Sequence, residues 1–179
     1  METAWLFDTL AVTLARIDFL DPELDTAPDT RERGVRLEIR PIESEHVGSV
    51  YASPTVTLQP AVCRIDLLES APGAADRMHW HPTMQAGEPG DRTFDPDIPV
   101  DPLVWLDSHL EQVTKLLEHA GVEDTALHER SACEISDHRA EIVAAAGAGL
   151  EWARCPWPDV EHDGRGMAVL VSSQPQPFG

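Results

Sequence analysis

Residues 35–40, VRLEIR, alternate apolar and charged side chains without interruption. An alternation with a period of two is typical of a β-strand that buries one face and exposes the other to water. Residues 50–58 repeat the alternation, and Pro54 within them favours an edge strand or a bulge, because proline cannot donate a ladder hydrogen bond. Two further strands are predicted at residues 61–69 and 77–82. The short connections between these segments favour antiparallel pairing.

Helical patterns are found on both sides of these strands. Residues 3–17 carry leucine or isoleucine at spacings of four, four and three residues, which predicts a helix with one apolar face. Residues 102–120 repeat apolar side chains at spacings of three and four residues. Asp101 is a natural N-cap for this second helix, and Gly121 suits the position just past its end. We therefore predict a helix at each of the two places.

A third helix is predicted at residues 137–153, with Ser136 or Asp137 as its N-cap. Its interior contains the run from Ala144 to Gly149, in which every side chain is small or absent. This run lacks the lysine and the further glycine of a phosphate-binding loop. It therefore indicates close packing of the helix against a sheet or another helix.

The order of the predicted elements fixes the fold class. A last strand is expected at residues 167–171, after the third helix. The sequence predicts an α+β fold, in which three helices pack on an antiparallel sheet of about four to five strands. We expect residues 1–171 to form a single domain and residues 172–179, with two prolines and two glutamines, to form a flexible tail.

The charge of the chain limits its partners. Thirty-two acidic residues against 13 basic ones give a formal net charge of −19. Such a charge repels nucleic acids and anionic membranes, so neither is expected as a partner. No apolar run approaches the roughly 18 residues needed to span a bilayer, and the N-terminal residues lack a basic leader, so we expect a cytoplasmic protein. The acidity fits a well-solvated surface, a basic protein partner or mimicry of nucleic acid.

The three cysteines are Cys63, Cys133 and Cys155. Their wide spacing forms no CxxC pair, so neither a disulfide framework nor a thiolate zinc site is indicated. We expect three free thiols that are mostly buried.

Candidate chemistry concentrates in residues 77–82, RMHWHP. On a strand, Arg77, His79 and His81 share one face, whereas Met78 and Trp80 point to the other face. Imidazoles two residues apart lie about 7 Å apart at their Cβ atoms, which is close enough to share a metal ion. Two histidines with one carboxylate are typical of hydrolytic zinc and of non-haem iron, so the predicted cofactor is a divalent ion, zinc or iron.

The third ligand has several candidates. Cys63 is expected on a neighbouring strand, and Glu88, Asp91 and Asp95 lie in the long loop of residues 85–99 directly after the histidines. Glu88 or Asp91 is alternatively the general base of a reaction, and Arg77 is placed to bind an anionic substrate.

A short part of this region resembles the first motif of the cupins. Gly73, the five residues after it, His79 and His81 match the opening of that motif. The position expected to hold glutamate is Gln85, and no second motif follows in a strand. The resemblance covers about nine residues, and the chain is not assigned to the cupins.

Two functional hypotheses follow. The first is a small metal-dependent enzyme, hydrolytic or of the non-haem-iron type, that acts on a small molecule through His79 and His81. The second is a non-enzymatic acidic adaptor or regulator that binds a basic protein partner. Two alternatives for the histidines stay open, because paired histidines on strands also serve as structural hydrogen-bonding groups or as metal-free catalytic groups. The metal content of the purified protein separates the two functional hypotheses.

Overall fold

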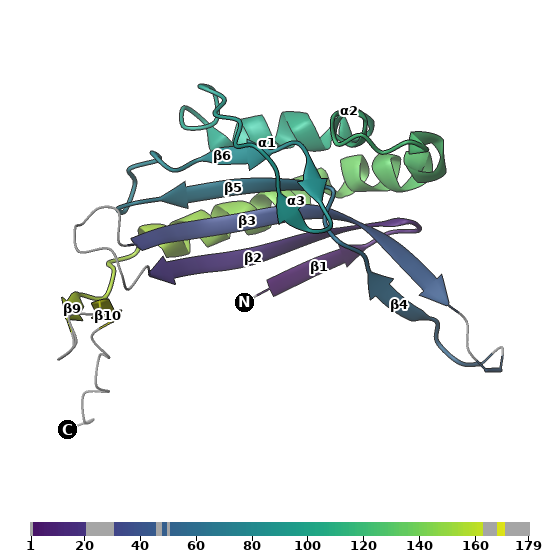
Figure 1. Ribbon diagram of the computed structural model, residues 1–179, viewed down its shortest axis with the longest axis horizontal. Helices are drawn as coiled ribbons and strands as arrows, with labels where there is room; N and C mark the ends of the chain where they lie inside the picture. Colours follow the sequence, from purple (N-terminus) through teal and green to yellow (C-terminus); the bar gives the residue numbers. More distant parts are fainter. Residues whose placement is uncertain (1, 21–30, 46–47, 50, 163–167, 171–179) are drawn as a thin grey trace.

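The structure is a computed structural model that describes residues 2–20, 31–45, 48–49, 51–162 and 168–170. Its main sheet has six strands, which are β1 (Glu2–Leu6), β2 (Leu10–Leu20), β3 (Arg31–Glu45), β4 (Thr55–Leu58), β5 (Cys63–Glu69) and β6 (His79–His81). The strand order is β1-β2-β3-β5-β6, and β4 pairs with the far end of β3 (Figure 1). Every pairing in this sheet is antiparallel.

Three α-helices lie on one face of this sheet (Figure 1). They are α1 (Pro102–Leu110), α2 (Val113–His119) and α3 (Glu129–Arg154), and the short 3-10 helix η1 (Thr125–His128) leads into α3. The core between the helices and the sheet holds fully buried side chains from both layers, such as Ile39, Ile65, Leu106 and Ile142. The predicted α+β class, an antiparallel sheet with three helices packed on it, is confirmed.

The predicted strands in the middle of the chain are present. Residues 35–40 lie within β3, and the segments predicted at residues 61–69 and 77–82 contain β5 and β6. Of the strand predicted at residues 50–58, only Thr55–Leu58 form one, because residues 51–54 make a turn and irregular backbone up to Pro54. Among the described residues, β4 pairs only with β3, as expected for an edge strand. At the other end of the chain, β9 (Val160–His162) and β10 (Ala168–Leu170) form a two-stranded sheet of their own. The predicted tail, residues 172–179, lies outside the described residues.

The helix predicted at residues 3–17 is wrong, because β1 and β2 form a hairpin there. Spacings of four residues fit a period of two as well as a helix, and the strand places Leu10, Val12 and Leu14 together on the buried face. Trp5 pairs with Val12 in the register, and its indole N–H donates to the Glu141 carboxylate of α3 at 2.8 Å. The N-terminal hairpin is thereby joined to the helical layer.

The helix predicted at residues 102–120 is divided into α1 and α2. Asp101 caps α1 as expected, with its side chain accepting from the Val104 amide. Near the end of α1, Ser108 and His109 both bond through their side chains to the Trp105 carbonyl. Side chains that compete for helix carbonyls bend or weaken a helix, and the break follows at residues 111–112.

The third helix is longer than predicted. It begins at Glu129, so Ser136 and Asp137 stand in its interior and are not its caps. Asp124 instead caps η1, which leads directly into α3. The small-residue run does pack closely, because a Cβ on Gly149 would lie 2.2 Å from Val35 of the sheet and one on Gly147 would lie 3.2 Å from Leu103 of α1.

All three cysteines are free, but only Cys63 is buried, so the expectation of mostly buried thiols is wrong. Cys133 and Cys155 lie on exposed positions of α3 and its C-cap. Within the described part of the chain, no helix has the length and apolarity needed to cross a bilayer.

Candidate metal centre

Strand register brings a carboxylate opposite the two histidines. Asp66 of β5 pairs with His79 of β6, and Arg64 pairs with His81. On the other side of β5, Asp66 pairs with Arg36 of β3. Side chains at paired positions point to the same face of a sheet, and here they point away from the helices. We call this surface the helix-free face; its polar side chains at the centre are Arg36, Glu38, Arg64, Asp66, His79 and His81.

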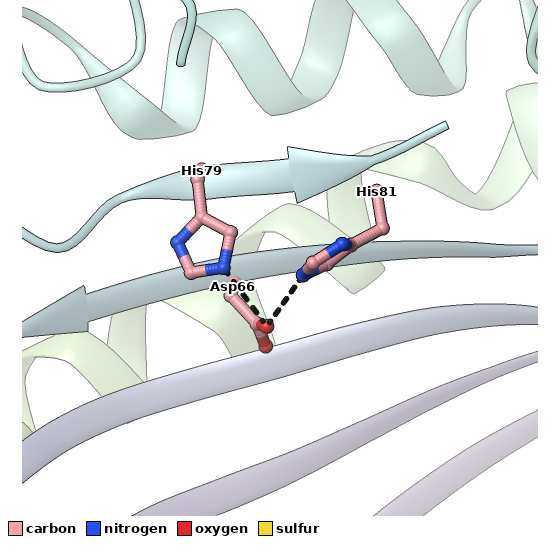
Figure 2. A group of neighbouring side chains, drawn as sticks. All are labelled: Asp66, His79 and His81. Carbon is pink, nitrogen blue, oxygen red and sulfur yellow. Dashed lines mark ion pairs between the residues drawn. The ribbon is translucent and has the colours of Figure 1, made fainter. Parts of the chain in front are cut away.

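The side chains of Asp66, His79 and His81 converge on one point (Figure 2). The Nε2 atom of His79 lies 3.6 Å from Oδ2 of Asp66, and the Nε2 atom of His81 lies 3.9 Å from the same oxygen. One ligand atom from each residue lies within 4.8 Å of the other two. The two imidazole rings meet edge to face, with centroids 5.0 Å apart.

The opposite ring nitrogens are held by backbone carbonyls. His79 donates from Nδ1 to the Arg77 carbonyl at 2.8 Å, and His81 donates from Nδ1 to the Gly90 carbonyl at 2.8 Å. A carbonyl only accepts, so Nδ1 carries the hydrogen and the Nε2 atom of a neutral ring presents a lone pair. Histidine ligands of metals are oriented in this way, with the second nitrogen donating to a carbonyl or carboxylate.

The three converging atoms are therefore all acceptors when the imidazoles are neutral. Distances of 3.6 and 3.9 Å exceed those of a hydrogen bond. Around a tetrahedral zinc ion with bonds of about 2.0–2.2 Å, neighbouring ligand atoms stand roughly 3.4 Å apart. Small movements of the side chains thus suffice to place a cation between them, and a cation resolves the repulsion between facing lone pairs.

The site is buried, and burial favours the neutral imidazole. Asp66 is 2% exposed, and both histidines are 4% exposed. Loss of solvent lowers the pKa of His79, and the nearby Arg92 and His81 lower it further. The Arg77 carbonyl and Asp66 act in the opposite direction without reversing the shift. A neutral imidazole is the form that binds a metal ion.

Arg36 orients the carboxylate. Its Nε donates to Oδ1 of Asp66 at 2.7 Å, and its Nη2 donates to Oδ2 at 3.3 Å. Oδ1 is thus occupied by the shorter bond, while Oδ2 faces the histidines. A cation beside a buried carboxylate offsets the cost of removing its charge from water. The possible metal-binding triad of Asp66, His79 and His81 therefore has a hydrogen-bond partner behind each of its three residues.

The residues after β6 fold back over the histidines. Trp80 and Thr93 exchange two backbone hydrogen bonds, of 3.1 and 2.8 Å. Between them, β7 (Met84–Gln85) and β8 (Glu88–Pro89) form a small hairpin that brings the Gly90 carbonyl to His81. Phe94 lies beside His79, with ring centroids 5.6 Å apart. The predicted long loop thus contacts the site through a carbonyl and an aromatic ring.

The other predicted ligands do not belong to the cluster that the histidines form with Asp66. Cys63 lies in the core on the opposite face of β5 from Asp66, where burial raises the pKa of its thiol to about 12. Glu88 and Asp91 are exposed on the loop. The Asp95 carboxylate accepts from the Trp105 indole and the Asp97 amide, each at 2.9 Å, so it anchors the loop to α1.

The backbone of Arg77 takes part in the site. Its carbonyl accepts from His79, and its guanidinium lies 4.0 Å from the Glu32 carboxylate and 3.9 Å from that of Asp76. Within the described residues, the cluster that could hold a metal ion is Asp66, His79 and His81.

Asp66 was not among the residues predicted from the sequence. The signal was present, because the alternation that places Cys63 and Ile65 toward the core places Asp66 on the other face of the strand. The missing information was the register between β5 and β6, which sets Asp66 opposite His79 and which no short pattern encodes.

No protein-family model, no curated protein and no solved structure matches this chain. The geometry of the site is therefore the basis on which a function can be proposed.

Proposed function

We propose that this protein is a metal-dependent enzyme that acts on a small molecule. In this proposal, a single divalent ion, zinc or ferrous iron, is held by Oδ2 of Asp66 and by Nε2 of His79 and His81. The observation that carries the proposal is the convergence of these three acceptor atoms in a buried place where, among the described residues, no donor bridges the carboxylate and the imidazoles. The Arg36 guanidinium reaches Oδ2 of Asp66 only through the longer of its two bonds, at 3.3 Å. Buried acceptors that face one another are costly unless a cation or a proton lies between them.

The number of ligands favours a reactive site over a structural one. Structural zinc sites have four protein ligands, whereas catalytic zinc and non-haem iron sites have three and leave positions open. Three protein ligands converge here within the described residues. When bound, zinc would supply Lewis acidity, polarising a substrate carbonyl and lowering the pKa of water. We favour hydrolysis, and oxidation at ferrous iron is the alternative for the same ligand set.

The roles of the loop acids are part of the proposal. Glu88 and Asp91 flank Gly90, whose carbonyl orients His81, and both carboxylates are exposed. Either acid could serve as general base if the loop closes further on a bound substrate. The role of Arg77 in binding an anionic substrate likewise stays a prediction.

Metal analysis of the purified full-length protein tests the proposal. After exposure to zinc or ferrous iron and removal of the excess, we expect about one ion per chain. His79→Ala and Asp66→Ala should each abolish retention of the ion. His109→Ala is the matched control, because His109 lies in α1, stacked on Trp105, and has no part in the cluster.

Equal metal contents in the control and in the two site variants would contradict the proposal. A protein that binds no metal would leave the acidic adaptor, which binds a basic protein partner, as the alternative. That alternative rests on the net charge of −19.

A further inference from the structure

A hollow lies on the helix-free face beside the candidate metal centre. Its volume is about 530 Å³, and its lining includes Ile17, Phe19, Glu32, Arg36 and Leu68. Sites for small molecules typically have volumes of about 300–1,000 Å³. The hollow is therefore large enough for a small organic ligand.

Strand register places the hollow next to the metal-binding residues. Ile17, Gly34 and Leu68 pair with one another across β2, β3 and β5, and so form one row on the helix-free face. The row beside it, two residues further along β3, contains Arg36 and Asp66 and continues to His79. Two residues of a strand span about 7 Å, so the rows are neighbours.

The row of Ile17, Gly34 and Leu68 is apolar, and no side chain rises from the sheet at its middle position. Gly34 contributes no side chain, and β3 and β5 approach so closely there that a Cβ on Gly34 would lie 2.0 Å from the Leu67 carbonyl oxygen. On either side stand Ile17 and the buried Leu68. Phe19, in the next row, is 53% exposed and forms an apolar wall of the hollow.

Charged groups stand at both ends of the hollow. Arg36 lines the hollow and also pairs with the Asp66 carboxylate, and this pair uses two of the five N–H groups of a guanidinium. Glu32 lines the other end and lies 4.0 Å from the Arg77 guanidinium. Arg16 and Asp18 also line the hollow, but their charged groups contact Trp152 and Arg31. By strand alternation these two side chains lie on the helical face, so an anionic group in the hollow is attracted to the Arg36 end and repelled from the Glu32 end.

We propose that this hollow is the substrate pocket of the metal centre. It takes a small molecule with an anionic, metal-coordinating head and an unbranched apolar tail. The head binds at Arg36 and the metal ion, and the tail lies over Gly34 against Ile17 and Phe19. This inference rests on the proposed function and adds to it the class of substrate.

Alkyl hydroxamates of increasing length test the inference, because their head chelates zinc and their tail probes the hollow. Aceto-, butano- and hexanohydroxamate are titrated into the zinc-loaded full-length protein in a calorimeter. Each buried methylene is worth about 0.8 kcal/mol, which corresponds to about a fourfold gain in affinity. We expect a gain on the order of 100-fold from acetohydroxamate to hexanohydroxamate.

Two variants locate the tail. Phe19→Ala should reduce the gain in affinity from acetohydroxamate to hexanohydroxamate about tenfold, and it should leave the affinity for acetohydroxamate unchanged. Val104→Ala, at a 63% exposed position of α1, should leave the whole series unchanged. Neither side chain is buried, so both variants are expected to fold.

The outcomes separate the two proposals. If zinc is retained and acetohydroxamate binds, but length adds no affinity or Phe19→Ala leaves the gain intact, the pocket is refuted and the metal centre stands. If metal analysis finds that the protein retains neither zinc nor iron, the proposed function fails, and the pocket inference fails with it.

Discussion

The orientation of His81 depends on a carbonyl held by a close crossing of two loop segments. The Gly90 carbonyl accepts from His81, and the Gly90 amide donates to the Thr83 carbonyl at 3.0 Å. A Cβ on Gly90 would lie 2.7 Å from the Thr83 hydroxyl oxygen and 2.8 Å from its carbonyl oxygen. Both distances are shorter than van der Waals contact, so any side chain at this position forces the two segments apart and displaces the carbonyl.

We therefore expect Gly90→Ala to weaken zinc binding. Loss of a hydrogen-bond partner behind a metal ligand typically reduces affinity by about 10- to 100-fold. Competition with a chromophoric chelator measures the change. Gly121→Ala is the control, because its strain comes from a φ of 73° with no atom within 4 Å of the added Cβ, and the position follows α2. An affinity of Gly90→Ala equal to that of the wild type would show that the carbonyl does not orient His81.

At this scale, the sequence predicted which side chains share a face but not the register between neighbouring strands. The alternation in residues 77–82 placed His79 and His81 together, and the structure has them converge. As a ligand, Cys63 would have to lie on the same face of the sheet as the histidines. Its sequence spacing from Ile65 instead places both side chains on the core face, where the structure has them. The Gly90 carbonyl has no side-chain signature, so no reading of residue types could have found it.

Asp76 holds together the two ends of the connection between β5 and β6. These two strands carry the metal-binding residues, so the connection affects how Asp66 is aligned with the histidines. The Asp76 carboxylate accepts from the Ser70 amide at 3.0 Å and from the Ser70 hydroxyl at 2.6 Å. Burial acts to raise the pKa of Asp76, but these hydrogen bonds and the neighbouring Arg77 outweigh burial, so the pKa lies below its usual value. The ionised carboxylate thus stabilises the folded chain.

The pH dependence of this contribution has a definite sign. Because the pKa of Asp76 is lower in the folded state, its contribution is present above the unfolded pKa, near 4, and is lost as pH falls through the folded pKa. Asp76→Asn should lower the urea midpoint at pH 7, and its difference from the wild type should shrink at about pH 3 or below. Asp97→Asn, at an exposed position, should match the wild type at both pH values. A difference for Asp76→Asn that is as large at pH 3 as at pH 7 would contradict an ionic contribution.

The contact between α3 and the sheet depends on Gly149. An added Cβ would lie 2.2 Å from Cγ1 of Val35, which is 1% exposed and has a stiff, β-branched side chain. Alanine in a helix interior is otherwise favoured over glycine by about 0.5–1 kcal/mol. Overpacking a core costs about 1–3 kcal/mol, so we expect Gly149→Ala to destabilise the protein on balance, as measured by urea unfolding.

Two further variants test whether the cause is steric. Gly147→Ala gains the same helix propensity, and its Cβ meets only the end of the flexible Leu103 side chain at 3.2 Å. We expect that variant to be neutral or slightly more stable than the wild type. In the Gly149→Ala background, Val35→Ala should lower the free energy of unfolding by less than it does in the wild type. The Cβ added at position 149 fills part of the space that the valine side chain leaves. If Gly149→Ala and Gly147→Ala have equal stability, close packing at Gly149 is not the reason for the glycine.

Over the whole molecule, the excess of acidic residues favours the binding of a cation. A net charge of −19 raises the local concentration of divalent ions and lowers that of anions. At the centre of the helix-free face, the acids are paired: Glu38 accepts from both Arg40 and Arg64, and Asp66 accepts from Arg36. Under our proposal, an anionic substrate approaches against the overall field, so its binding would depend on the local arginine and on the metal ion.

Binding of an ion to the folded chain must also raise its melting temperature. A ligand at about 100 times its dissociation constant stabilises the folded state by roughly 2.7 kcal/mol, which for a chain of this size corresponds to a shift of about 5–10 °C. Histidines and cysteines of the unfolded chain also bind zinc, so we expect the lower end of this range. Calorimetric scans with and without zinc measure the shift.

Asp66→Asn identifies the site responsible. This variant keeps the shape of the side chain but loses the charge, and it leaves the Arg36 guanidinium without its carboxylate, so its metal-free melting temperature should fall. The decisive quantity is the zinc-induced shift, which should nearly vanish in Asp66→Asn and persist in His119→Ala, which removes a histidine of α2 outside the cluster. Magnesium, which prefers oxygen ligands, should produce little shift in any of the three proteins. A zinc-induced shift of equal size in Asp66→Asn and the wild type would place the bound ion elsewhere on this acidic surface.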